Sequence, residues 1–455
     1  MNATIAAIST GQAPGGIGVI RISGPRALAV AQRVFRSRSG RGLAEIPGYQ
    51  ALLGQAFGAD GEALDDCVAL VFRAPKSYTG EDVVELSCHG GLYVTRRVLE
   101  EVLAAGASPA GRGEFTKRAY LNGKLDLAQA ESVMELIGAT GRQAARMARA
   151  GGSGRLSRRL EKIREDLEGV AAHLAAWADF PDEDVEELSQ AELRGVLERC
   201  KAGLDSLLAQ FEKGRIFREG LRTVIVGRPN VGKSTLMNWL AGRERSIVTP
   251  YAGTTRDVVE EPVSLAGVPL LLADTAGLRE TDDPVEEIGV AAARQRLASA
   301  ELALAVFDQS QALSGEDFQL MEELRQVPAI AVVNKSDLES RIDEEALRKA
   351  FPYVVECSAA EGRGLEALEE ALAALLGTSD FDPDAGELFT QRQRRAAASA
   401  GEALDQALEA LEAGVTLDAV TVCLDAALGD LYELTGQRVS EAVVDQVFER
   451  FCVGK

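Results

Sequence analysis

The chain has 455 residues, about the length of three domains, and 46% of them are hydrophobic, which is enough for ordinary buried cores. The 49 Lys and Arg against 70 Asp and Glu give a net charge of −21, which argues against a protein that coats nucleic acid non-specifically. The two histidines exclude a histidine-rich metal site, and the six cysteines, none in a C-x-x-C pair, are typical of free thiols in a reducing cytosol.

No targeting or membrane segment is expected. Met1–Gly11 lack the basic segment and apolar run of a signal peptide. No apolar run approaches the roughly 18 residues of a membrane span. We therefore expect a cytoplasmic protein with no membrane partner.

The first region, residues 1–118, has short apolar runs separated by Gly and Pro, as in a compact α+β domain. Its expected strands are Val19–Ile22, Cys67–Phe72 and Val83–Ser87. Residues 119–217 then show apolar side chains at spacings of three and four, which predicts helices. The clearest stripe consists of Leu156, Leu160, Ile163, Leu167 and Val170.

Residues 218–377 alternate apolar strands with helical segments, which indicates a doubly wound sheet buried on both faces. The expected strands are Arg222–Gly227, Val268–Asp274, Leu302–Asp308, Ala329–Asn334 and Tyr353–Cys357. A short acidic linker, Gly377–Gly386, follows, and residues 378–455 return to helical periodicity. If these later helices pack on the earlier ones, the sheet domain is an insertion into a discontinuous helical domain.

Two basic clusters interrupt the acidic chain. Several arginines lie between Arg142 and Arg159, and Arg392, Arg394 and Arg395 form a second group. Each cluster taken alone is more often a solvated helix face than a binding surface. A local basic face remains the alternative.

The segment Gly227–Ser234 fits G-x-x-x-x-G-K-[ST] between a strand and a helix, as a phosphate-binding loop requires. Its glycines let backbone NH groups face phosphate oxygens, and the following helix adds the positive end of its dipole. Lys233 can reach the β- and γ-phosphates, and Ser234 can bind Mg²⁺.

Two more motifs select GTP. Asp274–Gly277 follows a second strand, where an acid near the metal and a glycine NH near the γ-phosphate are needed. Asn334–Asp337 ends another strand, and the Asp337 carboxylate can accept from the ring NH and amine of guanine, groups that adenine does not present together. Thr255, after Thr254, is the favoured second Mg²⁺ ligand. The nucleotide site is expected to comprise Asn230, Val231, Gly232, Lys233, Ser234, Thr235, Thr249, Pro250, Tyr251, Ala252, Gly253, Thr254, Thr255, Asp274, Thr275, Ala276, Gly277, Asn334, Lys335, Asp337, Ser358 and Ala359.

The residues that catalyse hydrolysis are harder to identify, because Leu278 occupies the position where Ras-like GTPases have a water-orienting Gln. Asn230 can offer an oxygen to a monovalent cation, and Glu286 can orient water. Each also has an ordinary interpretation, as a turn residue and as part of a solvated acidic stretch.

The whole chain resembles the tRNA modification GTPase MnmE (TrmE) family. The matching segments are Thr4–Ile8, Gly18–Gly24, Ser77–Asp82, His89–Gly91, Gly113–Phe115, Leu121–Glu131, Asp179–Asp182, Gly253–Asp257 and Phe451–Lys455. The resemblance implies an α+β multidomain fold class: an N-terminal α/β tetrahydrofolate-binding-like domain, a discontinuous helical domain and an inserted α/β P-loop GTPase domain.

The resemblance also implies a reaction. Family members act with the FAD-containing partner MnmG, as a heterotetramer, to add a carboxymethylaminomethyl or aminomethyl group at the 5-position of the wobble uridine of certain tRNAs. It implies a homodimer whose G domains meet across GTP, with K⁺ at that interface bound by Asn230, Thr249, Tyr251 and Thr254. Glu286 matches the water-orienting glutamate and Arg279 a switch arginine.

A 5-formyltetrahydrofolate site carries over to Arg21, Glu85, Lys124 and Lys455, which would otherwise be taken for surface charges. Cys452 matches a family cysteine and is a candidate catalytic residue without an assigned role, although a lone Cys is more often a small buried apolar residue. The rival to tRNA modification is a GTP-switched RNA-binding protein of ribosome assembly. That class would place a KH module or a second G domain beside the first, and this sequence shows neither.

Overall fold

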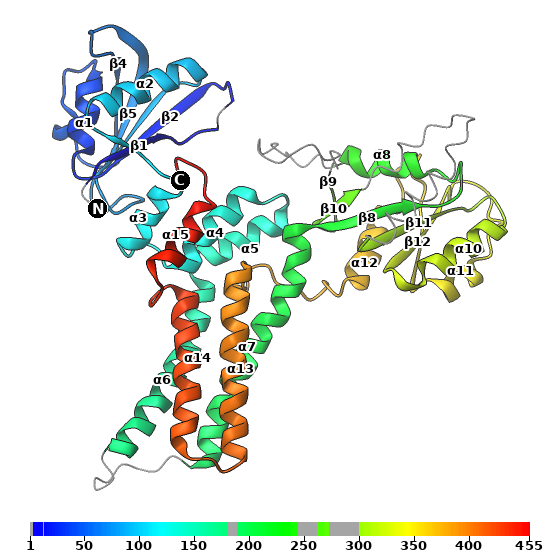
Figure 1. Cartoon of the computed structure of the whole chain (residues 1–455). Helices are drawn as coiled ribbons and strands as arrows, with labels where there is room; N and C mark the ends of the chain where they lie inside the picture. The colour runs from blue at the N-terminus through cyan, green and yellow to red at the C-terminus, as the bar shows by residue number, and fades with distance from the viewer. Residues whose placement is uncertain (1–2, 12, 180–188, 244–261, 273–299) are drawn as a thin grey trace, which may run out of the picture. The chain divides into compact units, whose positions relative to one another are not determined.

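The computed structural model describes residues 3–11, 13–179, 189–243, 262–272 and 300–455 (Figure 1). The chain divides into two compact units. The first comprises Met1–Met134, Leu160–Asp179 and Val415–Lys455, and the second comprises Glu135–Arg159 and Phe180–Gly414. No helix within the described ranges is long and apolar enough to cross a membrane.

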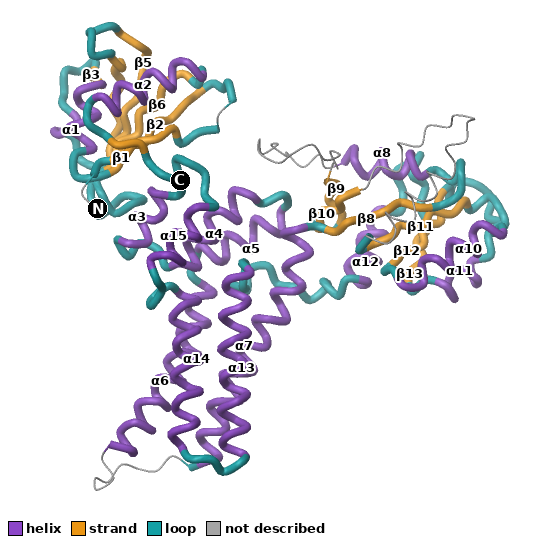
Figure 2. The backbone as a smooth tube through the Cα atoms, in the orientation of Figure 1, coloured by secondary structure: helices purple, strands orange, loops and turns teal. Residues whose placement is uncertain are grey.

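The first unit contains a seven-stranded sheet of order β3-β4-β5-β6-β2-β1-β7, in which every neighbouring pair is antiparallel except β1 and β7. The strands are β1 (Ile5–Ile8), β2 (Ile17–Ser23), β3 (Phe35–Ser37), β4 (Gln50–Phe57), β5 (Ala63–Phe72), β6 (Val83–His89) and β7 (Ser108–Pro109). Helices α1 (Ala27–Val34) and α2 (Leu92–Ala104) cover one face, as Figure 2 shows.

Period-two alternation decides what each face of this sheet presents. In β2, Ile20 and Ile22 point into the core under α1 and α2, while Arg21 between them points to the opposite face. In β6, Val84 and Leu86 are buried in the same core, and Glu85 between them is not. Because Arg21 pairs with Glu85 in the ladder, their side chains lie together on the face opposite α1 and α2.

The C-terminal segment packs beside this sheet domain. A cluster of Leu127, Ala130, Val444, Val447, Phe448 and Phe451 joins α4 (Leu127–Gly138) to α15 (Glu441–Glu449). Arg112, just before α3 (Glu114–Leu121), forms a β-bridge with Val453. The unit also contains the short η1 (Leu43–Glu45), most of α6 (Arg155–Asp179) and α14 (Leu417–Thr435), where the Tyr432 hydroxyl donates to Glu168 of α6.

The second unit contains a six-stranded sheet of order β13-β12-β11-β8-β10-β9, parallel except for the edge strand β9. The strands are β8 (Leu221–Val226), β9 (Pro262–Leu265), β10 (Val268–Leu272), β11 (Leu302–Asp308), β12 (Ala329–Asn334) and β13 (Tyr353–Glu356). One core lies under α8 (Lys233–Arg243) and α12 (Leu365–Leu375). A second lies under α10 (Gly315–Glu323), η3 (Leu324–Gln326) and α11 (Glu344–Ala350), so the sheet is doubly wound as expected.

The helices before and after this sheet pack against each other. Helices α5 (Arg142–Gly152) and α7 (Gln190–Glu219) precede it, and α13 (Gln391–Glu412) follows it. The ion pairs Lys201–Asp405 and Arg394–Glu212 link α7 to α13. Ser189 and Thr390 start these two helices with capping boxes. The sheet domain is therefore inserted into a discontinuous helical domain, and the expected fold class is confirmed.

Several elements had no expectation from the sequence, namely β1, β3, β4, β7, β9, α1 and α2. The expected divisions at 118 and 217 fall inside α3 and α7. A continuous helix shows no break in periodicity where one domain passes into the next, so composition changes locate such a border only approximately.

Candidate functional site

The phosphate-binding loop Gly227–Ser234 joins β8 to α8, and its backbone requires glycine at two positions. Gly227 has φ +151° and Gly232 has φ +98°, values that disfavour other residues. A Cβ would come within 2.4 Å of the Val306 carbonyl at Gly227, and within 2.2 Å of Asn334 Nδ2 at Gly232. Asn230, with φ 64°, takes a left-handed conformation that Asn tolerates. The loop is therefore a tight turn closed against the ends of β11 and β12.

Lys233, the first residue of α8, folds back over this loop. Its Nζ donates to the carbonyl oxygens of Gly227 at 2.8 Å and Arg228 at 2.7 Å. Burial lowers the pKa of the Lys233 ammonium, because desolvation disfavours the charged form. A half-buried ammonium at the mouth of a turn of backbone NH groups is suited to bind an anion.

Asn334, at the end of β12, joins three parts of the predicted nucleotide site. Its side chain is buried, its Nδ2 donates to the Val231 carbonyl at 2.9 Å, and its Oδ1 accepts from the Ala359 NH at 3.0 Å. The nitrogen and the oxygen of the Asn334 side-chain amide thus both fix the phosphate loop against the Ser358–Ala359 turn. These three segments are more than 20 residues apart along the chain.

Asp337 lies exposed beside this turn, where its Oδ1 accepts from the buried Ser358 hydroxyl at 2.6 Å. That hydrogen bond holds the pKa of the Asp337 carboxyl below its ordinary value. The carboxylate is therefore ionised and acceptor-only at neutral pH, the form that can accept two NH groups of a guanine edge.

One residue that sequence reasoning missed is Asp308, the last residue of β11. It is 2% exposed, and it accepts from Lys335 Nζ at 2.6 Å and from Ser310 Oγ at 2.6 Å. Burial acts to raise the pKa of Asp308, but these partners hold it below its ordinary value. Lys335 also donates to the Asn230 carbonyl at 2.9 Å, so Asp308 holds Lys335 across the phosphate loop. An acid at the end of an otherwise apolar strand was the available signal.

The remaining predicted nucleotide residues divide into two groups. Ser234 and Thr235 are exposed in the first turn of α8. The others lie outside the described residues: Thr249, Pro250, Tyr251, Ala252, Gly253, Thr254, Thr255, Asp274, Thr275, Ala276, Gly277, Arg279 and Glu286. Among the ranges that are described, no group of three or more His, Cys, Asp or Glu side chains could hold a metal ion. Of the predicted ligands, Ser234 for Mg²⁺ and Asn230 for K⁺ are the ones described.

A second site lies on the face of the seven-stranded sheet opposite α1 and α2. A cavity of about 330 Å³ is lined by Arg21, Phe72, Tyr78, Val83, Glu85, Val133 and Lys455. It brings together three of the four residues predicted for folate, from β2, β6 and the C-terminus. The Arg21 Nε donates to Glu85 Oε1 at 2.8 Å, and the guanidinium lies 5.7 Å from the centre of the Tyr78 ring.

The fourth predicted residue, Lys124, does not line this cavity. Its Nζ donates to the Pro75 carbonyl at 3.2 Å, and its stem lies beside Gly80. Lys124 therefore contacts the segment between Pro75 and Gly80 and is not among the residues that line the cavity.

Backbone hydrogen bonds hold the C-terminus at the cavity. The Phe115 NH donates to the Lys455 carbonyl at 3.2 Å, the Gly113 NH to Cys452 at 3.3 Å, and the Ser9 hydroxyl to Gly454 at 3.0 Å. Cys452 itself is exposed, so its interpretation as a small buried residue is wrong. The buried position is taken by the preceding Phe451, whose ring packs on Phe448.

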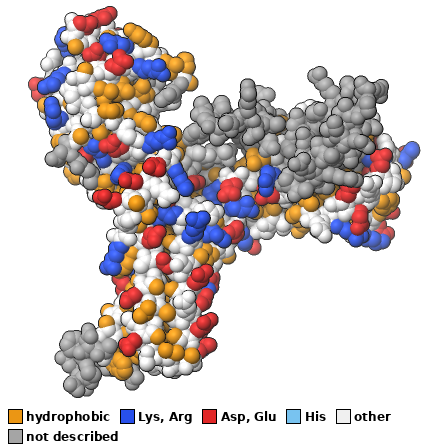
Figure 3. All heavy atoms as spheres, in the orientation of Figure 1, with side chains coloured by type: hydrophobic (Ala, Val, Ile, Leu, Met, Phe, Trp, Pro, Cys, Tyr) orange, Lys and Arg blue, Asp and Glu red, His pale blue; other side chains and the backbone are white. Residues whose placement is uncertain are grey.

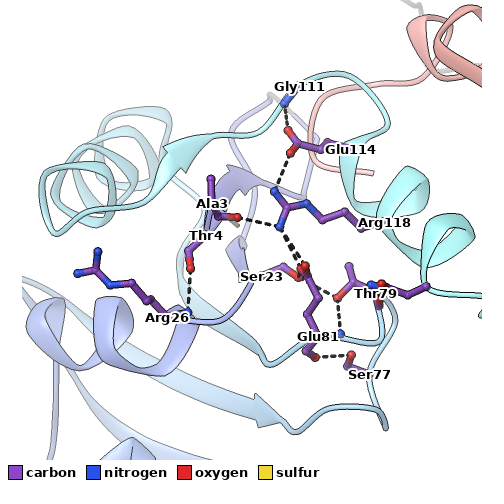
Figure 4. Close-up of polar contacts among 11 residues, drawn as sticks. Ala3, Thr4, Ser23, Arg26, Ser77, Thr79, Glu81, Gly111, Glu114 and Arg118 are labelled. Atoms are coloured by element: carbon purple, nitrogen blue, oxygen red, sulfur yellow. Dashed lines mark hydrogen bonds and ion pairs between the residues drawn. The ribbon is translucent and has the colours of Figure 1, made fainter. Parts of the chain in front are cut away.

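The segment that carries Tyr78 is fixed by a polar network that the sequence did not predict (Figure 4). Arg118 is 4% exposed and forms ion pairs with Glu81 at 3.1 Å and Glu114 at 2.8 Å. Ser23 donates to Glu81 at 2.7 Å, and the Thr79 hydroxyl is 2.8 Å from the Ser23 hydroxyl. The motif Ser77–Asp82 therefore serves mainly to build a loop that presents Tyr78 to the cavity.

Comparison with known proteins gives matches along the whole chain. The MnmE helical domain model matches residues 127–452, and the model of the GTP-binding protein TrmE N-terminus matches residues 4–124. The tRNA modification GTPase MnmE of Symbiobacterium thermophilum is 47% identical over 455 residues. That of Heliobacterium modesticaldum is 44% identical over 462 residues, and both alignments cover 99% of this chain and 99% of the relative.

Similar solved structures match a smaller part of the chain. The G domain of the T. maritima FeoB iron transporter has 26% identity and a TM-score of 0.26, covering 34% of this chain and 98% of that one. Aquifex aeolicus Era bound to GDP·AlF4⁻ has 25% identity and a TM-score of 0.25, covering 40% of this chain and 66% of that one.

Proposed function

Because the chain belongs to the MnmE family of tRNA modification GTPases, and so is a GTP hydrolase, we propose that it modifies the wobble uridine of certain tRNAs. It acts with an FAD-containing MnmG partner, and the group added at the 5-position is carboxymethylaminomethyl or aminomethyl. GTP hydrolysis drives G-domain dimerisation and conformational change within a homodimer, and GTP is not consumed in the modification itself.

The observation that carries this proposal is the pairing of two sites in one chain. A guanine-nucleotide site with a phosphate loop and a guanine motif belongs to many switch proteins. The cavity with Arg21, Glu85 and the C-terminal Lys455 belongs to the other unit, and Arg21 and Glu85 lie within the residues 4–124 that match the TrmE N-terminus model. A chain that only switched on GTP would have no use for the second site.

In the nucleotide site, each described residue has a task that follows from its contacts. The loop NH groups and Lys233 bind the phosphates, Ser234 supplies a hydroxyl to Mg²⁺, and Asp337 accepts from guanine. Asn334 is a positioning residue, because its two amide hydrogen bonds fix the loop and the base-binding turn to each other. Mg²⁺, when bound, neutralises charge on the β- and γ-phosphates.

Hydrolysis is stimulated by K⁺, for which Asn230 offers a side-chain oxygen from an exposed loop position. The other ligands proposed are Thr249, Tyr251 and Thr254, with Thr255 on Mg²⁺, Glu286 orienting water and Arg279 assisting. A bound cation supplies positive charge where Leu278 leaves the water-orienting Gln position without a polar group. GTP turnover should rise when K⁺ replaces Na⁺, and equal rates in the two salts would contradict this part of the proposal.

The cavity beside the seven-stranded sheet fits a tetrahydrofolate such as 5-formyltetrahydrofolate. Glu85 offers acceptors to an aminopyrimidine edge, Arg21 and Lys455 offer cations to carboxylates, and Phe72 and Tyr78 offer ring surfaces. Lys124 remains a candidate for the part of the ligand that would lie outside the cavity. Cys452 is accessible to a substrate, and its role in the modification is tested by Cys452→Ser.

The second candidate, a GTP-switched RNA-binding protein of ribosome assembly, gains no support. The regions beside the inserted domain match the MnmE helical domain and the TrmE N-terminus.

The decisive experiment is mass spectrometry of wobble nucleosides from cells that lack the protein. Loss of the 5-substituent, restored by the wild-type chain and not by Lys233→Ala, is the expected result. Normal wobble uridines in the deletion strain would overturn the proposal.

A further inference from the structure

An arginine-rich surface on α5 and the start of α6 has no part in either site. Residues 142–159 contain six arginines and no Asp or Glu, in a chain whose net charge is −21. In Figure 3, blue side chains gather in the region where Figure 1 labels α5. We define the arginine surface as Arg142, Arg146, Arg149, Arg155, Arg158 and Arg159.

Helical geometry places the three arginines of α5 on one side of that helix. Arg142, Arg146 and Arg149 are spaced by four and three residues, so they form one stripe along α5. The buried residues of α5 are Ala144, Met147, Ala148, Ala150 and Gly151. Gly151 packs so closely on the Phe389 ring that a Cβ would come within 2.3 Å of it. The packed face and the arginine stripe are therefore different faces of the helix.

Acidic partners neutralise only part of this charge. Arg146 pairs with Asp384, and Arg159 pairs with Glu387 at 3.0 Å. Six guanidinium groups against two carboxylates leave four in excess, and Arg142, Arg149, Arg155 and Arg158 are all exposed. The hydrogen bond from Arg146 lowers the pKa of the Asp384 carboxyl, and the charges of Arg146, Arg155 and Arg149 lower it further. Several cations therefore converge on one half-buried carboxylate.

We propose that the arginine surface binds the phosphodiester backbone of the substrate RNA. This inference rests on the proposed role in tRNA modification, and it names where that partner is held. Guanidinium forks bind phosphate oxygens with two hydrogen bonds, and a surface where arginines outnumber their carboxylate partners, in an otherwise acidic protein, favours RNA binding at that place. Contacts of this kind position the RNA without reading its bases.

Charge neutralisation of two exposed arginines tests the proposal. Arg149→Gln with Arg158→Gln removes two positive charges and no buried side chain. Binding of the full chain to a labelled unmodified tRNA transcript is measured by fluorescence anisotropy over a series of potassium chloride concentrations. We expect affinity to fall roughly tenfold, and the slope of log affinity against log salt to become shallower by about 1.4 to 1.8, if each arginine contacts one phosphate.

The matched control is Arg325→Gln with Arg341→Gln. These side chains are 72% and 70% exposed, and the control also removes two positive charges from the same unit. It should keep the wild-type affinity and slope, because these two arginines are not part of the arginine surface and each has a carboxylate partner of its own. Both double variants should keep wild-type GTP turnover.

Equal affinity and slope for the two double variants, or no salt-dependent RNA binding by the wild-type chain, would overturn the inference. The inference would also be overturned if the arginine substitutions weakened binding of an acidic protein partner and left RNA binding unchanged. Failure of this inference can be told apart from failure of the proposed function. The proposed function fails if wobble nucleosides are unaltered in the deletion strain, whatever the affinity for RNA.

Discussion

The phosphate loop and the folate-type cavity are built in opposite ways. The loop draws its anion-binding groups from eight consecutive residues, Gly227–Ser234, most of them backbone NH groups in a turn that two glycines permit. The cavity draws its charged groups from Arg21, Glu85 and Lys455, which strand pairing and the docked C-terminus bring together. The first kind of site is formed within one short segment, which Asn334 and Lys335 hold in place, whereas the second exists only when several distant segments pack together.

The largest expected effect is a loss of stability in the polar network that holds the Tyr78 loop beside the cavity. Arg118→Ala would leave Glu81 as a nearly buried carboxylate without its cation, which costs about 3–5 kcal/mol in comparable buried pairs. Hydrogen exchange should show the free energy of opening in β1 and β6 falling by that amount. GTP turnover should be unaffected, and unchanged protection in β1 and β6 would mean that the network does not hold the cavity.

Lys233→Ala is the corresponding change in the phosphate loop. Loss of a cation that stabilises phosphate charge in the transition state should lower single-turnover GTP hydrolysis by about 10² to 10³-fold. Binding of 5-formyltetrahydrofolate should not change. Lys349→Ala, at an exposed lysine on α11, is the control and should hydrolyse GTP like the wild type; similar losses in both variants would contradict the assignment.

Comparing Glu85→Gln with Lys124→Gln tests whether the ligand contacts a residue that lines the cavity or one that lies outside it. Glu85 lines the cavity and is 21% exposed, so loss of its charge should weaken 5-formyltetrahydrofolate binding by about 10- to 100-fold. Lys124, which bonds to Pro75 outside the cavity, should matter less. Calorimetric titration measures both, and a larger loss for Lys124→Gln would show that the ligand lies mainly outside the cavity.

The smallest effect is a pH dependence at His89. The His89 ring Nδ1–H donates to the Asp65 carboxylate at 2.7 Å, and this hydrogen bond raises the pKa of His89 above its ordinary value of about 6.5. A raised pKa in the folded state means that this stabilisation is fully present below about pH 6.5 and is lost as pH rises through the folded pKa. An NMR titration should show the His89 pKa falling in Asp65→Asn; an unchanged midpoint would contradict the pairing.

Much of the inserted domain could be predicted from the sequence. Strands β11 and β12 have the predicted bounds, because a strand buried on both faces is a continuous apolar run. Strand β4 was missed because Gln50, Gly54 and Gln55 interrupt its alternation. Asp308 could not be recognised as a site residue from its position alone, since only the fold shows that Lys335 reaches both Asp308 and the phosphate loop.

The sequence by itself determined that this protein binds a nucleoside triphosphate, because a phosphate loop is a local backbone geometry encoded by nearby glycines, a lysine and a serine. The motif Asn334–Asp337 then selected guanine. The sequence also determined the family, through motifs spread over the whole chain. Only the tertiary structure decided that Arg21, Glu85 and Lys455 share a cavity while Lys124 stays outside it, and that Cys452 is exposed. Those outcomes depend on ladder register and on how the C-terminal segment packs, which are long-range contacts that no local pattern specifies.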